Sequence, residues 1–274
     1  MRSIVLIIIL IIASGTDFFG QEISGFKTFG RSADLMEKGD VRYSLFSKAE
    51  YGLTDKMTLS IHPLWIFMAP SVDVKWQIKK SDKNAIAIVH GISSPTPVMK
   101  LVAAEGTGGL ISPEFDIPFM LSVKNGLIST WHVGTIHRMS AELNVKVALF
   151  NSKLLPGSSI DLPVISPGNA VYYKNAGFNF GLVAEGVLFK KTDYYTGVQL
   201  FLFPFEDNEY KEEYPETGQY FGEWNTMIFF NTGTSFKIGA GTRLCYGDYP
   251  FGTQWHLLPQ LDFVKPTLCD RTSL

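Results

Sequence analysis

The sequence MSAELNVKVAL, from Met139 to Leu149, alternates strictly between apolar residues and polar or small ones. The apolar positions are Met139, Ala141, Leu143, Val145, Val147 and Leu149. The positions between them are Ser140, Glu142, Asn144, Lys146 and Ala148. Successive side chains of a strand point to opposite faces, so this stretch predicts a strand with one apolar and one polar face. Large apolar residues on one face and charges of both signs on the other favour a transmembrane β-barrel, with lipid outside and a polar lumen inside.

The composition suits a protein whose surface meets lipid, and it would also suit an ordinary secreted β-protein. Charged residues make up 18% of the 274 residues, against roughly 25% in soluble domains, and aromatic residues make up 14%. The formal net charge is −2, so no global charge favours nucleic acid as a partner. A secreted, soluble β-sandwich would also alternate and is an alternative at this point.

The N-terminus has the pattern of an export signal. Arg2 precedes an uninterrupted apolar run of ten residues from Ile4 to Ala13. This run is too short for a membrane-spanning helix, which needs about 20 residues, and no later apolar run approaches that length. Residues 1–20 are therefore predicted to be a cleaved signal peptide. A mature protein embedded in a membrane would have to be a closed barrel, because only helices and closed barrels satisfy the backbone in lipid.

Alternating segments recur along the chain and predict an all-β, antiparallel barrel of about 12 strands. We expect strands at 41–51, 57–67, 72–79, 85–92, 117–123, 127–137, 139–150, 175–185, 194–203, 223–232, 235–246 and 253–264. Lys124-Asn125-Gly126 is interpreted as a hairpin turn, because Asn-Gly favours tight turns. The predicted organisation is a lead-in segment at 21–40, a barrel domain at 41–265 and a C-terminal tail at 266–274.

Three long connections interrupt the strands, namely Ser93–Asp116, Asn151–Ala170 and Pro204–Gly222. Prolines within them cannot donate to a strand ladder, so we expect loops there. An even number of strands places both chain ends at one rim. The long loops would then lie at the opposite, extracellular rim, and the short turns at the periplasmic rim. The third loop is acidic, with six carboxylates from Glu206 to Glu216.

The segment Glu50-Tyr51-Gly52-Leu53-Thr54-Asp55 resembles the first hairpin of many small outer-membrane β-barrel proteins of Gram-negative bacteria. The resemblance covers this hairpin, the signal peptide and the general pattern. It implies a location in the cell outer membrane, with the lipid bilayer and the barrel-assembly machinery as partners. It carries over no catalytic or solute-binding residue. Such barrels often end on an aromatic residue, whereas this chain ends in Thr272-Ser273-Leu274 and has Phe263 as its nearest substitute.

No catalytic, cofactor-binding or metal-binding residue is predicted. The histidines are His62, His90, His132, His137 and His256. The sequence contains neither a Gly-x-Ser-x-Gly elbow nor a His-Glu-x-x-His motif. His132 and His137 have opposite parity on one expected strand, so they would not share a metal. Cys245 and Cys269 fit no metal spacing, and whether they pair as a disulfide is left open.

Charges with lumen parity are the candidate functional residues. They are Arg42, Lys48, Glu50, Asp73, Lys75, Glu142, Lys146, Glu185, Lys237, Arg243 and Asp262. Charges buried in a narrow lumen need partners, so one interpretation is a salt-bridged plug. The other is a polar pore, for which the near balance of signs predicts little ion selectivity.

The functional hypothesis is passive transport through a channel, or binding, of small solutes. One alternative is a lipid-modifying barrel enzyme with a rim serine beside His62, His90 or His137. A further alternative is a structural membrane protein or the secreted β-sandwich. A fold alone does not decide among these functions.

Overall fold

The computed structural model describes residues 31–44, 47–104, 111, 113–114, 116–134, 137–151, 166–189, 192–204, 219–231, 237–249 and 252–267. The expected signal peptide, the acidic run Glu206–Glu216 and Cys269 lie outside the described residues. No helix in the described part of the chain is long and apolar enough to cross a membrane.

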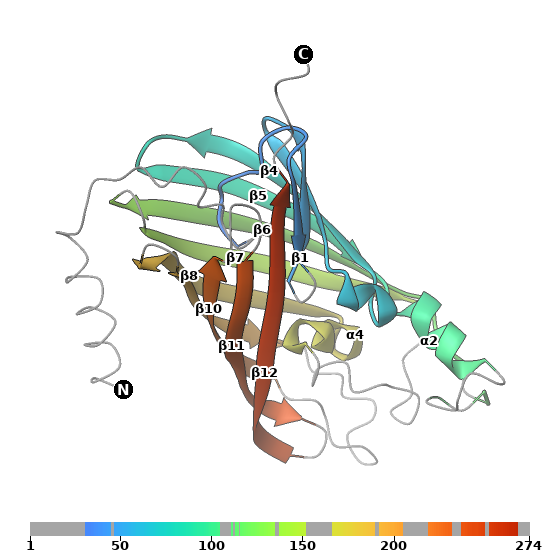
Figure 1. Cartoon of the computed structure of the whole chain (residues 1–274). Coiled ribbons are helices and arrows are strands. Elements are labelled where there is room, and N and C mark those ends of the chain that lie inside the picture. The colour runs from blue at the N-terminus through green and yellow to red at the C-terminus, as the bar shows by residue number, and fades with distance from the viewer. Residues whose placement is uncertain are drawn as a thin grey trace.

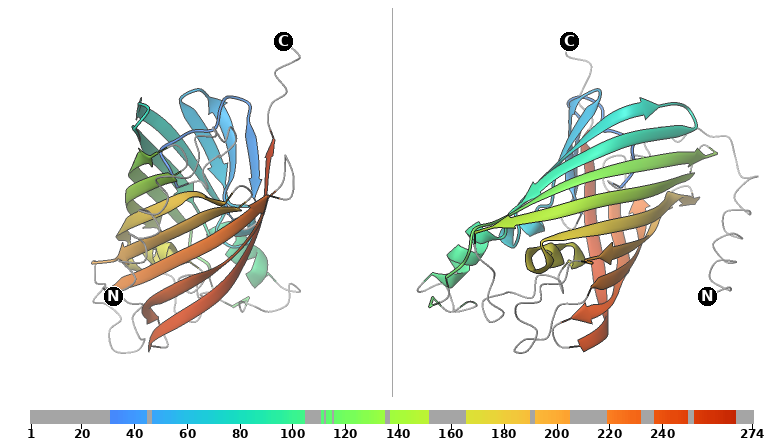
Figure 2. Two further views of the ribbon diagram at one scale, coloured as in Figure 1. Left: turned by 60° about the vertical axis from the view of Figure 1, so that its left-hand side comes forward. Right: turned by 180° about the vertical axis from the view of Figure 1, so that it is seen from behind.

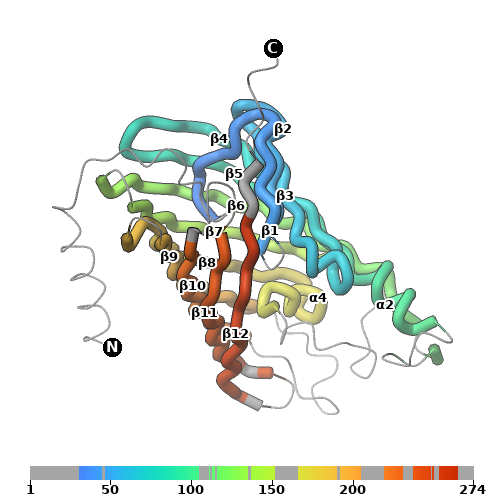
Figure 3. Tube along the Cα trace, in the orientation of Figure 1, coloured from blue at the N-terminus to red at the C-terminus, as the bar shows by residue number. Residues whose placement is uncertain are grey.

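Twelve antiparallel strands form a closed barrel, in which each strand pairs with its sequence neighbours and the first pairs with the last. The predicted fold class is confirmed (Figures 1 and 3). The strands are β1 (Val41–Ser44), β2 (Ala49–Thr54), β3 (Met57–Ile61), β4 (Ser71–Lys80), β5 (Asn84–Ser93), β6 (Met120–Val133), β7 (His137–Phe150), β8 (Ala176–Phe189), β9 (Thr192–Leu202), β10 (Tyr220–Asn231), β11 (Lys237–Tyr249) and β12 (Gly252–Thr267).

Apolar side chains lie on the outside of this barrel and polar ones inside, the reverse of the arrangement in a soluble protein. On β7, Leu143 is 52% exposed and Val145 is 38% exposed, whereas the inward-facing Ser140 and Asn144 are 3% and 4% exposed. The apolar face predicted for this strand is therefore the outer one. Strands that are apolar outside and polar inside are characteristic of transmembrane barrels. The closed topology excludes the β-sandwich alternative.

The prediction of a single strand at 41–51 is wrong, because these residues form a hairpin of two strands. β1 and β2 pair with each other, and Arg42 lies opposite Glu50 in their register. The two residues also form an ion pair, with 3.1 Å between Arg42 Nη2 and Glu50 Oε2. The alternating pattern continues through the hairpin, so periodicity alone does not reveal the reversal of direction.

The predicted turn at Lys124-Asn125-Gly126 is also wrong, because β6 runs straight through it. Gly126 lies opposite Asn144 of β7, and a Cβ on Gly126 would lie 1.9 Å from Asn144 Oδ1. This glycine therefore allows a close side-chain approach inside the lumen and makes no turn. The range 41–51 holds two strands where one was predicted, and β6 is one strand where two were predicted. The predicted count of twelve is therefore correct.

Short helices occur where the sequence analysis predicted strand or irregular loop. They are η1 (Leu64–Phe67) between β3 and β4, α2 (Thr96–Ala103) in the first long connection, and η3 (Pro167–Ala170) with α4 (Val171–Lys174) in the second. Proline is tolerated in the first turn of a helix, where its missing N–H has no intrahelical acceptor. The proline-rich starts of α2 and η3 are therefore compatible with helix.

Candidate functional site: the lumen chamber

The strand ends that flank the three long connections all lie at one rim of the barrel. The start of β1 and the end of β12, where Val41 lies opposite Thr267, lie at the other rim. Helices α2 and α4 lie at the rim of the long connections (Figures 1 and 2). Val171 and Tyr172 of α4 belong to one buried apolar cluster with Met99 of α2. This cluster fills part of the lumen at that end.

Tyr172 anchors α4 inside the barrel. Its hydroxyl lies 2.7 Å from Ser93 Oγ and 3.0 Å from Ser122 Oγ, on β5 and β6. Burial raises the pKa of the Tyr172 hydroxyl, so the group stays neutral and keeps its proton for hydrogen bonding. Helix α4, which precedes β8, is thereby fastened to β5 and β6.

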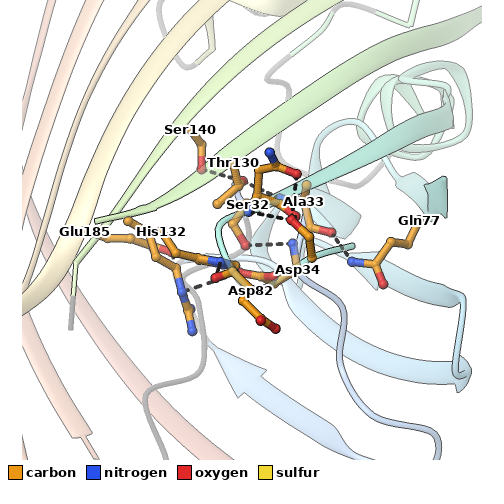
Figure 4. Close-up of polar contacts among 12 residues, drawn as sticks. Ser32, Ala33, Asp34, Gln77, Asp82, Thr130, His132, Ser140 and Glu185 are labelled. Atoms are coloured by element: carbon orange, nitrogen blue, oxygen red, sulfur yellow. Dashed lines mark hydrogen bonds and ion pairs between the residues drawn. The ribbon is translucent and has the colours of Figure 1, made fainter. Parts of the chain in front are cut away.

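Residues 31–40 are here called the inner segment, and Ser32, Ala33, Met36 and Asp40 within it are buried. Figure 4 shows Ser32, Ala33 and Asp34 inside the barrel beside Thr130 and His132, near the end of β6. The Ala33 backbone N–H donates to Thr130 Oγ1 at 2.8 Å, and Gln77 Nε2 donates to the Ala33 carbonyl at 3.1 Å. Asp34 Oδ2 lies 3.0 Å from His132 Nε2 and 3.4 Å from Arg138 Nε. The inner segment is thus held by side chains of β4, β6 and β7.

The inner segment also pairs with the backbone of β2. The Gly39 N–H donates to the Gly52 carbonyl at 2.8 Å, and the Gly52 N–H donates to the Asp40 carbonyl at 2.9 Å. Gly39 has φ of 84°, a conformation that favours glycine. These bonds satisfy backbone groups of a short strand and fix the segment against the wall.

A cavity of about 320 Å³ lies in the lumen between the inner segment and the η3–α4 helices. Arg31 of the inner segment and Gly168 of η3 both line it. Ser47, His62 and Trp65 line it on the side where β1, β2 and β3 are only four to six residues long. We call this cavity the chamber. Its charged wall consists of the cations Arg31, Lys48, Lys75, Lys124, Lys146 and Arg243 and the carboxylates Glu50, Asp73, Glu142 and Glu223.

Three of these carboxylates each contact two cations. The contacts are Glu50 with Arg42 at 3.1 Å and Lys75 at 3.7 Å, Asp73 with Lys124 at 2.8 Å and with Lys48, and Glu223 with Arg31 at 3.6 Å and Arg243 at 2.7 Å. Removal of charges from water is costly unless they are paired, so these networks hold the chamber wall together.

The structure distributes the predicted lumen charges unequally. Those that line the chamber are Lys48, Glu50, Asp73, Lys75, Glu142, Lys146 and Arg243. The other four lie elsewhere in the barrel: Arg42 pairs with Glu50, Glu185 with Arg138 at 4.0 Å, Lys237 with Asp193, and Asp262 accepts a hydrogen bond from Ser44 at 2.7 Å.

Sequence reasoning missed three charged residues of the chamber wall. Lys124 was assigned to a turn that does not exist. Glu223 lies on β10, whose inward face also carries the buried Met227 while the outward face carries Ile228, so alternation is weak there. Arg31 precedes the first strand and follows no periodic pattern, so only the tertiary structure brings it to Glu223.

The histidines are dispersed. His132 and His137, predicted on one strand, lie instead on the adjacent strands β6 and β7. His132 contacts Asp34, His137 contacts the Tyr194 hydroxyl at 3.3 Å, and His90 contacts Asn125 at 2.7 Å. Within the described residues, no group of three or more His, Cys, Asp or Glu side chains is placed to hold a metal ion. Cys245 is buried on β11.

No family model and no curated protein matches this sequence. Among solved structures, an outer-membrane channel from Pseudomonas putida F1 is similar, with a TM-score of 0.50, 7% identity, and coverage of 88% of this chain and 100% of that one. A bacterial polysaccharide outer membrane secretin matches with a TM-score of 0.46 and 8% identity over 84% of this chain and 70% of that one. LpxR from Salmonella typhimurium matches with a TM-score of 0.44 and 9% identity over 84% of this chain and 90% of that one. The chain has the fold of an outer-membrane β-barrel protein.

Proposed function

We propose that this protein resides in the outer membrane of a Gram-negative bacterium and takes small polar solutes into its chamber, for binding or for passive passage. The apolar outer face of the barrel supports the membrane location, because an aqueous environment would penalise so much exposed apolar surface. In this proposal the rim of the long connections faces outward and the rim of the chain ends faces the periplasm.

The observation that carries the proposal is the chamber itself. A cavity of about 320 Å³, lined by polar and charged side chains from strands around the barrel, is large enough for a small organic solute. The inner segment occupies the lumen on the proposed periplasmic side, so passage would require that segment to move. The side lined by Ser47, His62 and Trp65 would be the entrance.

Uptake of small neutral sugars into proteoliposomes tests this function. Gln199 lines the chamber, whereas its neighbour Val198 is on the outer face and is 49% exposed. We expect Gln199→Trp to fill part of the chamber and to reduce uptake or solute retention severalfold, and Val198→Trp to leave it unchanged. Equal behaviour of the two variants, or complete impermeability together with no retained solute in the wild type, would refute the proposal.

A further inference from the structure

One row of the barrel ladder brings two lysines side by side. In the strand register, Asp73 of β4 lies opposite Gly91 of β5, Gly91 opposite Lys124 of β6, and Lys124 opposite Lys146 of β7. Residues directly opposite in a ladder point to the same face, and all three charged side chains line the chamber. A Cβ on Gly91 would lie 2.0 Å from Asp73 Oδ1 and 3.1 Å from Lys124 Cε. This glycine therefore lets Asp73 and Lys124 meet.

The charges in this row do not cancel. Asp73 Oδ1 lies 2.8 Å from Lys124 Nζ, and its other oxygen contacts Lys48 Nζ. Lys146 has different neighbours: its Nζ donates to the Gly168 carbonyl at 3.4 Å and lies 5.2 Å from the centre of the Tyr172 ring. Lys48 and Lys124 thus share the carboxylate of Asp73, and Lys146, directly opposite Lys124, contacts a carbonyl and an aromatic ring instead of a carboxylate.

The other carboxylate on the same strand does not compensate for Lys146. Asn144 lies between Glu142 and Lys146 in the inward row of β7, and its Nδ2 donates to Glu142 Oε1 at 2.6 Å. Asn144 Nδ2 also lies 2.9 Å from Asn179 Oδ1. Glu142 is therefore engaged with the amide, and among the described contacts of Lys146 none is to a carboxylate.

We propose that Lys48, Lys124 and Lys146 form a binding site for an oxyanion, the phosphate or carboxylate group of a small solute. Directly opposed like charges destabilise a sheet, and a bound anion would relieve this repulsion. Ammonium groups bind phosphate and carboxylate oxygens through charge-assisted hydrogen bonds. The site would give the chamber a preference for anionic solutes over neutral ones. It rests on the proposed function only because the solute must reach the chamber.

Isothermal titration of the full-length protein in detergent micelles tests the site. The probes are inorganic phosphate and citrate, at an ionic strength held constant with chloride. Lys146→Met removes the charge and keeps an apolar stem, Lys146→Arg keeps the charge, and Lys79→Met removes an exposed lysine from β4 as the matched control. We expect saturable binding that weakens at least about tenfold in Lys146→Met and is retained in the other two variants, since only Lys146→Met loses a charge-assisted hydrogen bond to the anion.

Binding of phosphate, of citrate or of both, lost only in Lys146→Met, would support the site and identify the oxyanion class. Absence of saturable binding by the wild type, or equal affinity in Lys146→Met and Lys79→Met, would overturn it. These two negative results would leave the proposed transport function untouched, because uptake of neutral sugars measures that function in a separate experiment.

Discussion

The backbone carbonyl of Glu37 occupies the space that a side chain at Gly52 would need: a Cβ on Gly52 would lie 1.8 Å from the Glu37 oxygen. Because Gly52 belongs to β2 and Glu37 to the inner segment, this contact allows a strand of the wall and the segment in the lumen to pack backbone to backbone. Because glycine has no Cβ at position 52, the inner segment can lie directly against β2.

Gly52→Ala should displace the inner segment. The clash is with backbone, which cannot rotate away, so the segment or β2 must shift. We expect a higher conductance in planar bilayers than for the wild type. Gly222→Ala is the control, because its added Cβ would have its nearest neighbour at 3.9 Å. Identical conductance of the two variants would show that the segment does not restrict the lumen.

Asp34→Asn should loosen the same segment by a different route. The substitution removes the carboxylate that lies 3.0 Å from His132 Nε2 and 3.4 Å from Arg138 Nε. Loss of one charge-assisted contact, worth about 1.5–3 kcal/mol, would raise the population of the displaced segment about tenfold or more. Single-channel open probability measures this population, with the exposed Asp55→Asn as control. An open probability no higher than that of Asp55→Asn would contradict this role.

Asp73→Asn should destabilise the barrel strongly. It leaves Lys48 and Lys124 without their shared carboxylate. Because the side chain of Lys48 is 38% exposed and that of Lys124 is 20% exposed, we expect a loss of about 1–3 kcal/mol, between the costs for surface and for buried ion pairs. Urea unfolding in lipid vesicles, followed by tryptophan fluorescence, measures the free energy of unfolding. Asp55→Asn again serves as control. A loss below about 1 kcal/mol would indicate that the cations find other partners or water.

Lys146→Met should increase stability while it weakens anion binding. Removal of one of two opposed lysines relieves a repulsion of roughly 0.2–1 kcal/mol. The same urea titration should therefore show a higher unfolding midpoint for Lys146→Met than for Lys79→Met. A lower midpoint would mean that the contacts of Lys146 with Gly168 and Tyr172 outweigh the repulsion from Lys124.

Leu143→Lys tests the lipid-facing surface of β7. Leu143 is 52% exposed on the outer face, and a lysine near the bilayer midplane costs roughly 2–4 kcal/mol. We expect a loss of this size in folding free energy in vesicles. Leu101→Lys on α2, at a site 66% exposed outside the strands, should cost little. Equal, small effects would argue against lipid contact at Leu143.

Alternation along the chain is enough to predict which face each regular strand presents to lipid. The alternation from Met139 to Leu149 correctly placed Leu143 outside and Asn144 inside, because the side-chain period of a strand is two whatever its neighbours are. The shared rim of the three long connections does not follow from the predicted strands, because the first connection comes after the fourth of them and the second after the seventh. The β1–β2 hairpin adds a reversal of direction, so the connections follow β5, β7 and β9 and share one rim.

Turns were harder to predict, because local signals compete with long-range packing. Asn125-Gly126 favours a hairpin locally, but the ladder with β7 continues and uses the glycine to make room for Asn144. The β1–β2 hairpin shows the opposite error. Residues 41–51 alternate like one continuous strand, yet the chain reverses within them and Arg42 pairs with Glu50.

Which charges line the chamber, and which partners they contact, depends on how the twelve strands come together. Strand parity gives the direction of a side chain but not its depth along the barrel, so Lys48 and Lys237 looked equivalent although one lines the chamber and the other pairs with Asp193. The inner segment has no periodicity, so its position beneath β2 follows from contacts between residues distant in sequence. The opposed pair of lysines likewise emerges only when the register sets Lys124 beside Lys146, because ladder register is a property of two strands and not of either alone.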